Sequence, residues 1–372
     1  MQPPPDVAIL LDRFGSGGVE RVACHVANGL HDAGLRVEVA VLDDTGPVRA
    51  LLDPGIVVVC IGTSKIGRRD RRTIAAVPVI AKYLRERKPR VLHSPGNHTN
   101  RPVAIACAVA RFPGVFVPKI TNPILNARMS PRRRLTRKWA YRWVLRNAQA
   151  ILVLTRAAIE EVTEIDPRLR DRVRVVHNPY VSEDMLAKAA DRDPAEPPII
   201  LNIGRLSQQK NQALLLRAAA RLGDRPWRVR ICGTGPDEEA LRALADELGI
   251  ADRVDFAGFV SDPTQEYGMA TVLAVSSQWE GLPAIVLEAI ACGCPVVSTA
   301  SSPGLVELLN DIGARSPVAL NDEEGFAEAL RAALEGNLPE VSNAASLPYS
   351  IEASRAEHAQ LFDELLGNHR IR

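Results

Sequence analysis

Two glutamates near the C-terminal end of the chain are spaced in a way that suits the binding of sugar hydroxyls. Glu280 and Glu288 flank a Gly281-Leu282-Pro283 turn and the start of an apolar run. An ionised carboxylate accepts hydrogen bonds from paired hydroxyls, which both a hexose and a ribose offer. Two solvated surface glutamates are the alternative. However, a charge between Leu287 and Ala289 in an apolar helix needs a partner.

The turn between the two glutamates favours an anion. Pro283 suits the first position of a helix, where its missing N–H costs nothing. The backbone N–H groups that follow it point out of the helix, and the helix dipole makes that end positive. Residues 277–297 therefore predict a strand, a loop, a helix and a strand, with a phosphate or sugar phosphate bound at the loop.

Two cations follow another predicted strand. Arg205 and Lys210 lie in the loop that follows the strand predicted at 199–202, and open α/β sheets bind ligands at the carboxyl ends of their strands. The pair suits a diphosphate, with roughly 1.5–3 kcal/mol from each charge-assisted hydrogen bond. An Arg and a Lys on an ordinary surface loop are the alternative.

Glycines end several predicted strands. Gly233 follows residues 228–232, and Gly258 begins a Gly-Phe-Val string that continues with Phe259 and Val260. Glycine lets a flat ligand approach the backbone closely, although it is also common in turns for conformational reasons.

A further glycine-rich turn, which includes Gly17 and Gly18, opens the first predicted helix and offers backbone N–H groups to a phosphate. A dinucleotide-binding fingerprint would need glycine where Glu20 stands, which argues against an NAD-dependent oxidoreductase.

The Glu-x7-Glu spacing of residues 280 and 288 resembles the signature of retaining GT-B glycosyltransferases of family 4, also called glycosyl transferases group 1. The resemblance covers most of residues 6–366, and its specific motifs concentrate between 202 and 309. It implies that Glu280 meets the donor hexose and Glu288 the nucleotide ribose, while Arg205 and Lys210 neutralise the pyrophosphate. The predicted donor-binding residues are Gly17, Gly18, Arg205, Lys210, Gly233, Gly258, Phe259, Val260, Glu280, Gly281, Leu282, Pro283 and Glu288.

A catalytic histidine is predicted by a second resemblance. Residues 93–98, His-Ser-Pro-Gly-Asn-His, are similar in outline to the histidine-rich strand end of bacterial glycogen synthases, although Pro95 and Gly96 replace a His and an Asp of that family. The resemblance implies that His98 hydrogen-bonds the donor sugar and supports its developing positive charge. A loop histidine without a catalytic role is the alternative, and His93 is predicted to be structural. The catalytic candidates are His98, Glu280, Arg205 and Lys210.

The family resemblance implies transfer of a hexose or N-acetylhexosamine from a nucleotide sugar, for which we expect UDP. The acceptor would be a hydroxyl of a glycan or lipid-linked molecule, in cell-envelope or exopolysaccharide biosynthesis. The resemblance implies front-face attack with retention, in which the leaving phosphate takes the acceptor proton. We expect no metal or other cofactor, because the only Asp-x-Asp, at 191–193, lies in a predicted linker. A GT-B epimerase or sugar phosphorylase, or a non-enzymatic lipid- or nucleic-acid-binding protein, is the alternative.

Strands and helices alternate along the chain, which predicts parallel, doubly wound sheets. Its 372 residues, 46% of them hydrophobic, suffice for two cores. Strands are predicted at 7–11, 36–42, 56–61, 90–93, 115–121, 150–154, 173–176, 199–202, 228–232, 254–256 and 271–276, and helices at 18–33, 74–87, 101–111, 212–222, 237–248 and 351–366.

The predicted fold is α/β of the GT-B class, with two Rossmann-like domains facing across a cleft. We assign 1–185 to an acceptor-binding domain, 186–198 to a linker rich in Pro and charge, and 199–348 to a nucleotide-sugar-binding domain. Residues 349–372 are predicted to form a C-terminal helix that crosses back to pack on the N-terminal domain.

The first 180 residues of the chain are basic and the remainder is acidic. Residues 1–180 contain 30 Lys and Arg against 15 Asp and Glu, whereas the remainder contains 16 against 29. Much of the excess lies in Lys65–Arg72 and in Arg128–Arg146, which interleaves eight basic residues with Trp139, Tyr141 and Trp143. This composition suits a helix on an anionic membrane surface. A solvated helix whose Trp residues pack inward, or a nucleic-acid contact, is the alternative, and we do not expect nucleic acid.

The sequence predicts a cytoplasmic protein, peripheral at most at the inner face of the cytoplasmic membrane. Residues 1–6 do not form the basic start of a signal peptide, and no apolar run is long enough to span a bilayer. The six cysteines show neither CxxC spacing nor a nearby His pair, which argues against disulfides and zinc.

Overall fold

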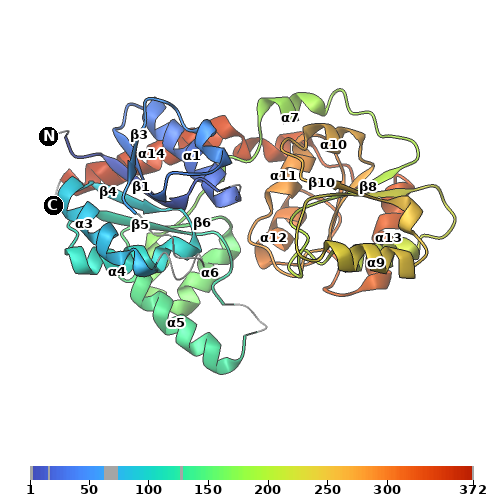
Figure 1. The fold of residues 1–372 in the computed structure, drawn as a ribbon, viewed down its shortest axis with the longest axis horizontal. Helices are drawn as coiled ribbons and strands as arrows, with labels where there is room; N and C mark the ends of the chain where they lie inside the picture. Colours follow the sequence, from blue (N-terminus) through green and yellow to red (C-terminus); the bar gives the residue numbers. More distant parts are fainter. Residues whose placement is uncertain (1–2, 16, 63–73, 126–128, 371–372) are drawn as a thin grey trace. The chain divides into compact units, whose positions relative to one another are not determined.

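The computed structural model describes residues 3–15, 17–62, 74–125 and 129–370. Its chain forms two compact units (Figure 1): residues 1–179 with 351–372 make up unit 1, and residues 180–350 make up unit 2. The chain therefore passes between the units at 179–180 and again at 350–351. The helix α7 (Glu183–Lys188) lies in unit 2 and extends into the segment that the sequence assigned to a linker.

Within its described residues, unit 1 contains a sheet of seven parallel strands in the order β3-β2-β1-β4-β5-β6-β7. The strands are β1 (Val7–Arg13), β2 (Val37–Asp43), β3 (Val57–Cys60), β4 (Val91–Ser94), β5 (Val115–Ile120), β6 (Ile151–Val153) and β7 (Val173–Val175). The helices of this unit include α1 (Gly18–Asp32), η1 (Pro47–Leu51), α3 (Val77–Arg87), α4 (Asn97–Ala110), α5 (Pro131–Leu145), α6 (Arg156–Ile165), η2 (Pro167–Arg172) and α14 (Ile351–Arg370).

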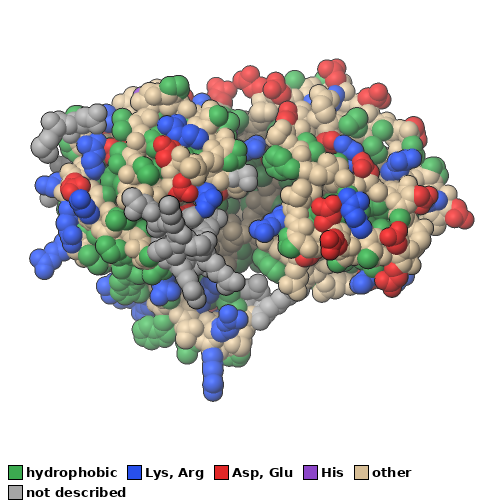
Figure 2. Space-filling view, in the orientation of Figure 1, with side chains coloured by type: hydrophobic (Ala, Val, Ile, Leu, Met, Phe, Trp, Pro, Cys, Tyr) green, Lys and Arg blue, Asp and Glu red, His purple; other side chains and the backbone are tan. Residues whose placement is uncertain are grey.

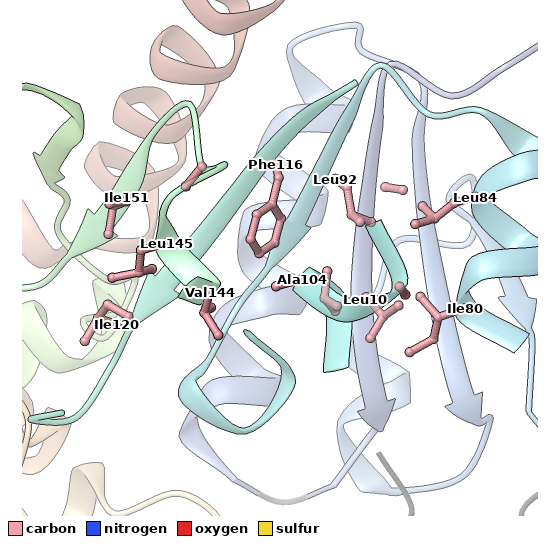
Figure 3. Packing of buried hydrophobic residues seen from close by; sticks show 14 of the residues in the cluster. Leu10, Ile80, Leu84, Leu92, Ala104, Phe116, Ile120, Val144, Leu145 and Ile151 are labelled. Carbon is pink, nitrogen blue, oxygen red and sulfur yellow. The ribbon is translucent and has the colours of Figure 1, made fainter. Parts of the chain in front are cut away.

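The core of unit 1 lies between the sheet and its helices. Figure 3 shows Leu10, Leu92 and Phe116 of adjacent strands facing helix residues such as Ile80 and Val144. Side chains of this kind each contribute about 1.5–3 kcal/mol when they are fully buried. Helices cover both faces of the sheet at its centre, so β4 and β5 are buried along their whole length, including the polar residues His93 and Lys119.

The last helix, α14, returns to unit 1. It packs closely on α1, because a Cβ on Gly29 would lie only 2.6 Å from the Cβ of Arg355. The buried Phe362 meets the imidazole of His93 edge to face, at 5.5 Å between ring centroids. The predicted return of the C-terminal helix to the first domain is thus confirmed.

Unit 2, which is described throughout, contains five parallel strands in the order β10-β9-β8-β11-β12. They are β8 (Ile199–Ile203), β9 (Arg228–Cys232), β10 (Val254–Gly258), β11 (Val272–Val275) and β12 (Val296–Ser298). Besides α7, its helices are α8 (Gln212–Ala220), α9 (Glu238–Glu247), η3 (Ala251–Arg253), α10 (Thr264–Met269), α11 (Ala284–Ala291), α12 (Pro303–Asp311), α13 (Glu323–Leu334) and η4 (Asn343–Tyr349).

Both units are Rossmann-like, which confirms the predicted fold class. In each sheet the strand order reverses beside the first strand, between β1 and β4 in unit 1 and between β8 and β11 in unit 2. At such a point the loops after the two strands diverge and leave a crevice for a ligand. Across the described ranges, no helix combines the length and the apolarity that crossing a membrane requires.

Candidate functional site

The predicted residues of unit 2 lie together at one edge of its sheet. Arg205 and Lys210 follow β8, and Glu280 follows β11, the neighbouring strand at which the order reverses. Gly233 follows β9, and Gly258 ends β10. Since all of these strands are parallel, their carboxyl ends meet at the same edge, which places the candidate site there.

Lys210 and Glu280 form an ion pair across the point of strand reversal. The Nζ of Lys210 lies 2.6 Å from Oε1 of Glu280, and the hydroxyl of Ser277 donates to the same oxygen at 2.8 Å. Glu280 is 7% exposed. Among the described residues, Oε2 of Glu280 receives no hydrogen bond, so this oxygen is the one that can accept a ligand hydroxyl.

Hydrogen bonds hold the loops after β8 and β11 against each other. The backbone N–H of Gln278 donates to the carbonyl of Gln209 at 2.7 Å, and the Gln209 side chain donates to the carbonyl of Trp279 at 3.0 Å. The hydroxyl of Ser276 donates to the Lys210 carbonyl at 2.9 Å. The Lys210–Glu280 pair is therefore built into a rigid junction. Arg205, in contrast, is exposed and available to a diphosphate.

Three successive loops stack at this edge through their backbones. Gly204 donates to the carbonyl of Cys232, and Gly233 donates to the carbonyl of Gly258 at 2.7 Å. Gly233 has φ of 155°, and a Cβ there would lie 1.9 Å from the Gly204 carbonyl oxygen. No other residue fits at position 233. Beyond Gly258, the ring of Phe259 is 68% exposed and offers a flat apolar surface, with Val260 beside it in the chain.

The Gly281-Leu282-Pro283 turn leads into α11, whose first residue is Ala284. The hydroxyl of Ser302 donates to the Gly281 carbonyl at 2.7 Å, and that of Tyr180 donates to the Leu282 carbonyl at 3.4 Å. The residue before the helix, Pro283, provides no side-chain cap for its first turn. The start of this helix is thus held in place next to Glu280, with its positive end at the site.

Glu288 has the buried partner that a charge in an apolar helix requires. The hydroxyl of Tyr267, on α10, donates to Oε2 of Glu288 at 2.7 Å. Tyr267 is 0% exposed. Burial raises its pKa well above the usual value, and the negative charge of Glu288 also raises it, to a smaller extent. The sequence analysis did not single out Tyr267, because nothing local in the chain links it to a carboxylate 21 residues away.

The candidates of unit 1 also share a sheet edge. Gly17 and Gly18 stand at the start of α1, which follows β1, and His98 stands at the start of α4, which follows β4. A Cβ on Gly96 would lie 2.9 Å from the Val19 side chain and 3.4 Å from Nδ1 of His98. The two helix starts are therefore neighbours at the point of strand reversal in this unit.

His98 lies on a helix rather than on the predicted strand end. α4 begins at Asn97, four residues before the start predicted from the sequence. Pro102 accounts for the difference, since a proline inside a helix removes a backbone donor and usually marks an end. The side chain of Asn97 joins the helix start to the chain after β5, with bonds of 2.8 Å to Thr121 N–H and the Asn122 carbonyl.

His93 is part of the core of unit 1. Its side chain is 1% exposed, and its Nδ1 lies 2.9 Å from the Val117 carbonyl. Burial and, to a smaller extent, the charge of Lys119 lower its pKa to about 3, so the ring is neutral at ordinary pH. This supports the structural role that the sequence predicted.

The basic helix α5 combines exposed and buried aromatic residues. Trp139 is 64% exposed and Leu135 58%, whereas Tyr141 and Trp143 pack partly against the core. Part of its charge is paired, because Glu164 contacts Arg134 and Lys138, and Asp166 contacts Arg142. Figure 2 shows many Lys and Arg side chains on unit 1 and many Asp and Glu on unit 2. The basic residues of 65–72 and Arg128 lie outside the described residues.

Two family models match the chain. The model described as "Glycosyl transferases group 1" matches residues 186–346, and that described as "Glycosyl transferase 4-like domain" matches residues 17–179. Together they cover most of both units.

Individual proteins are similar over different lengths. An N-acetylgalactosamine-N,N'-diacetylbacillosaminyl-diphospho-undecaprenol 4-alpha-N-acetylgalactosaminyltransferase of Campylobacter jejuni is 26% identical over 88% of this chain and 90% of its own length. The lipopolysaccharide core biosynthesis glycosyltransferase LpsE of Rhizobium meliloti is 32% identical, over 52% of this chain and 56% of its own.

Solved structures share the fold. HepE of Anabaena, in complex with UDP and glucose, superposes with a TM-score of 0.74 at 20% identity, over 96% of this chain and 99% of that one. Because both family models match in the expected order on two Rossmann-like units, the chain belongs to the GT-B glycosyltransferases of family 4, glycosyl transferases group 1.

Proposed function

We propose that the protein is a retaining glycosyltransferase that moves a hexose or N-acetylhexosamine from a UDP-sugar to a hydroxyl of a glycan or lipid-linked acceptor. The observation that carries the proposal is the Lys210–Glu280 ion pair beside Arg205, at the point of strand reversal of unit 2. A cation pair next to a carboxylate with an unoccupied oxygen matches a diphosphate joined to a polyhydroxylated ring.

Each part of the donor has a proposed partner in unit 2. Arg205 and Lys210 bind the diphosphate, and Oε2 of Glu280 accepts a hexose hydroxyl. Glu288 accepts the ribose hydroxyls. Gly258, Phe259 and Val260 border the base, with the exposed Phe259 ring as an apolar surface for it. The stacked loops at Gly233 hold these partners in register.

The same groups favour departure of the nucleotide. As the bond between sugar and phosphate breaks, negative charge grows on the diphosphate, and the cations of Arg205 and Lys210 stabilise it most at that moment. The acceptor hydroxyl attacks from the side that the diphosphate leaves and passes its proton to the leaving phosphate oxygen. We propose that His98 supports the positive charge on the sugar, and that no metal ion is needed.

The names of relatives support the kinds of donor and acceptor. The Campylobacter jejuni relative is named for a diphospho-undecaprenol acceptor and an α linkage, and LpsE for lipopolysaccharide core biosynthesis. Anabaena HepE was crystallised with UDP-glucose. An α-linked product from an α-linked UDP-sugar corresponds to retention. We therefore place the reaction in cell-envelope or exopolysaccharide biosynthesis.

Thermal unfolding with a panel of nucleotides and nucleotide sugars tests the donor assignment. A ligand that binds only the folded state raises the unfolding temperature with the logarithm of its concentration. We expect UDP and one UDP-sugar to do so, and Lys210→Ala to abolish the shift. Arg225→Ala, which removes an exposed ion pair with Glu335, is the control and should keep it. A shift with NAD but none with any nucleotide sugar would refute the proposal.

Product analysis tests the rest. We expect release of UDP only when an acceptor is present, at an unchanged rate in EDTA, and an anomeric NMR coupling that reports retention. Product without an acceptor would indicate an epimerase, and dependence on inorganic phosphate would indicate a phosphorylase.

We also propose that α5 contacts an anionic membrane surface, consistent with a lipid-linked acceptor. Leu135 and Trp139 are one helical turn apart and exposed, and basic residues surround them in the sequence. Cosedimentation with vesicles checks this: a Leu135→Ala/Trp139→Ala variant should bind anionic vesicles less than wild type, whereas Leu347→Ala, at an exposed leucine of unit 2, should not. Equal partition of wild type to neutral and anionic vesicles would exclude the docking.

A further inference from the structure

We propose that Tyr267 is a positioning residue that holds the carboxylate of Glu288 for the ribose of the nucleotide. Its hydroxyl lies 2.7 Å from Oε2 of Glu288, and its side chain is 0% exposed. This inference rests on the proposed function, since it concerns how the ribose contact of that function is made.

The hydroxyl can only act as a donor in this pair. An ionised carboxylate accepts hydrogen bonds and cannot donate them, and burial keeps Tyr267 protonated at every working pH. The bond therefore holds Oε2 of Glu288 against the buried hydroxyl of Tyr267. A carboxylate has about four lone-pair positions, so one buried hydroxyl does not exhaust its capacity to accept ribose hydroxyls.

The helix that carries Tyr267 is itself fixed. Glu266, the preceding residue, binds Arg230 of β9 through two bonds, at 2.7 and 2.9 Å. At the other end of α10, Asp262 accepts bonds from the backbone N–H and hydroxyl of Thr264, at 3.0 and 2.6 Å. The Tyr267 hydroxyl is therefore a donor on a rigid support that is tied to the same sheet as the site, which is what precise orientation of a binding carboxylate requires.

The position of Glu288 explains why such a support matters. Glu288 is half-buried on α11 among Leu287 and Ala289, which are fully buried. A glutamate side chain has several rotamers, and freezing it on binding costs free energy. A hydrogen bond that selects the rotamer beforehand removes that cost, and it should appear as affinity for the ribose hydroxyls in particular.

The test compares UDP with 2′-deoxy-UDP and 3′-deoxy-UDP by titration calorimetry, in wild type, Tyr267→Phe and Glu288→Gln. At least one of the two deoxy analogues should bind wild type with a Kd about tenfold or more above that of UDP, the size expected for one hydrogen bond to a charged group. Tyr267→Phe should reduce that preference to about threefold or less, as Glu288→Gln should. Because each protein is compared with itself on two ligands, a general loss of stability does not imitate the result.

The control is Tyr83→Phe, which removes the same kind of bond in unit 1. The Tyr83 hydroxyl donates to buried Glu38 at 2.6 Å, so its loss should lower stability and leave the preference for UDP at the wild-type value. If Tyr267→Phe keeps the full preference while Glu288→Gln loses it, the positioning role is wrong and the proposed function stands. If Glu288→Gln also keeps it, or wild type binds no UDP, the proposed ribose contact fails and Tyr267 has nothing to position.

Discussion

The ammonium group of Lys119 donates a hydrogen bond to Oδ1 of Asn178 at 2.5 Å, one residue before the chain passes from unit 1 to unit 2 at 179–180. Lys119 is 1% exposed, and its Nζ also lies 3.3 Å from Nε2 of His358 on α14. Lys119 of β5 thus contacts the segment that leads out of unit 1 and the helix with which the chain returns to it.

This burial predicts a pH dependence of stability. Desolvation lowers the pKa of Lys119 to about 7, against a smaller opposite effect of Glu357. Between pH 7 and about 10.5 the unfolded chain holds a proton that the folded one has lost, so stability should rise with pH over this window, by about 1.4 kcal/mol per pH unit at most. Below pH 7 both states are protonated and this contribution is constant.

Urea unfolding of wild type and Lys119→Met from pH 7 to 10 checks it. Buried thiols oppose the trend above pH 9, because burial raises the pKa of groups such as Cys24 and Cys292 to about 12, but both proteins share them. The unfolding free energy of wild type minus that of Lys119→Met should therefore rise with pH. Lys82→Met, at an exposed lysine, should run parallel to wild type. Parallel curves for Lys119→Met would contradict the prediction.

The Lys210–Glu280 pair predicts coupled losses. Lys210→Ala leaves a nearly buried carboxylate with Ser277 as its described donor, which should cost about 1–3 kcal/mol of stability, and donor affinity or turnover should fall tenfold or more. Glu288→Ala should also reduce donor affinity or turnover tenfold or more. The double variant Lys210→Ala/Glu280→Gln should lose less stability than the sum of the losses in Lys210→Ala and Glu280→Gln, since the two residues share one bond. Urea unfolding and UDP titration measure these effects, and wild-type UDP affinity in Lys210→Ala would overturn the site assignment.

Gly233→Ala should disrupt the stacked loops. The new Cβ would meet the Gly204 carbonyl oxygen at 1.9 Å, and φ is already 155°, so the loops must move apart. We expect loss of more than about 2 kcal/mol of stability, together with loss of UDP binding. Gly249→Ala is the matched control, because φ there is 68° but no atom lies within 4 Å of the added Cβ. It should cost about 1 kcal/mol and leave UDP binding intact. Equal effects of both variants would mean that the close approach is unimportant.

His98→Ala separates binding from turnover. The proposed contacts to UDP lie in unit 2, whereas His98 lies in unit 1, so the Kd of UDP should be unchanged. The kcat should fall by roughly 100-fold or more if the imidazole stabilises charge in the transition state. His31→Ala, at a partly exposed histidine of the same unit, should leave both constants at wild-type values. A wild-type kcat in His98→Ala would show that His98 has no catalytic role.

Local patterns were sufficient for the strands and for the residues that follow them. An apolar run followed by glycine, or by a short polar segment, predicts a strand end in almost any context, so Arg205, Gly233, Gly258 and Glu280 could be placed at strand ends before the fold was known. Helix limits were less certain where local signals conflict. The predicted start of α4 fell past His98, because the contacts that hold Asn97 at the helix start come from residues 24 and 25 positions away.

The amino-acid sequence by itself determined which side chains could bind a sugar nucleotide and that two Rossmann-like sheets would present them. Only the tertiary structure decided which of them touch. Lys210 meets Glu280 across 70 residues of chain because β8 and β11 are neighbours in the sheet, and Tyr267 meets Glu288 because α10 and α11 pack together. Partners of buried polar groups are chosen by strand order and helix packing, which depend on the whole core and leave no local pattern in the chain.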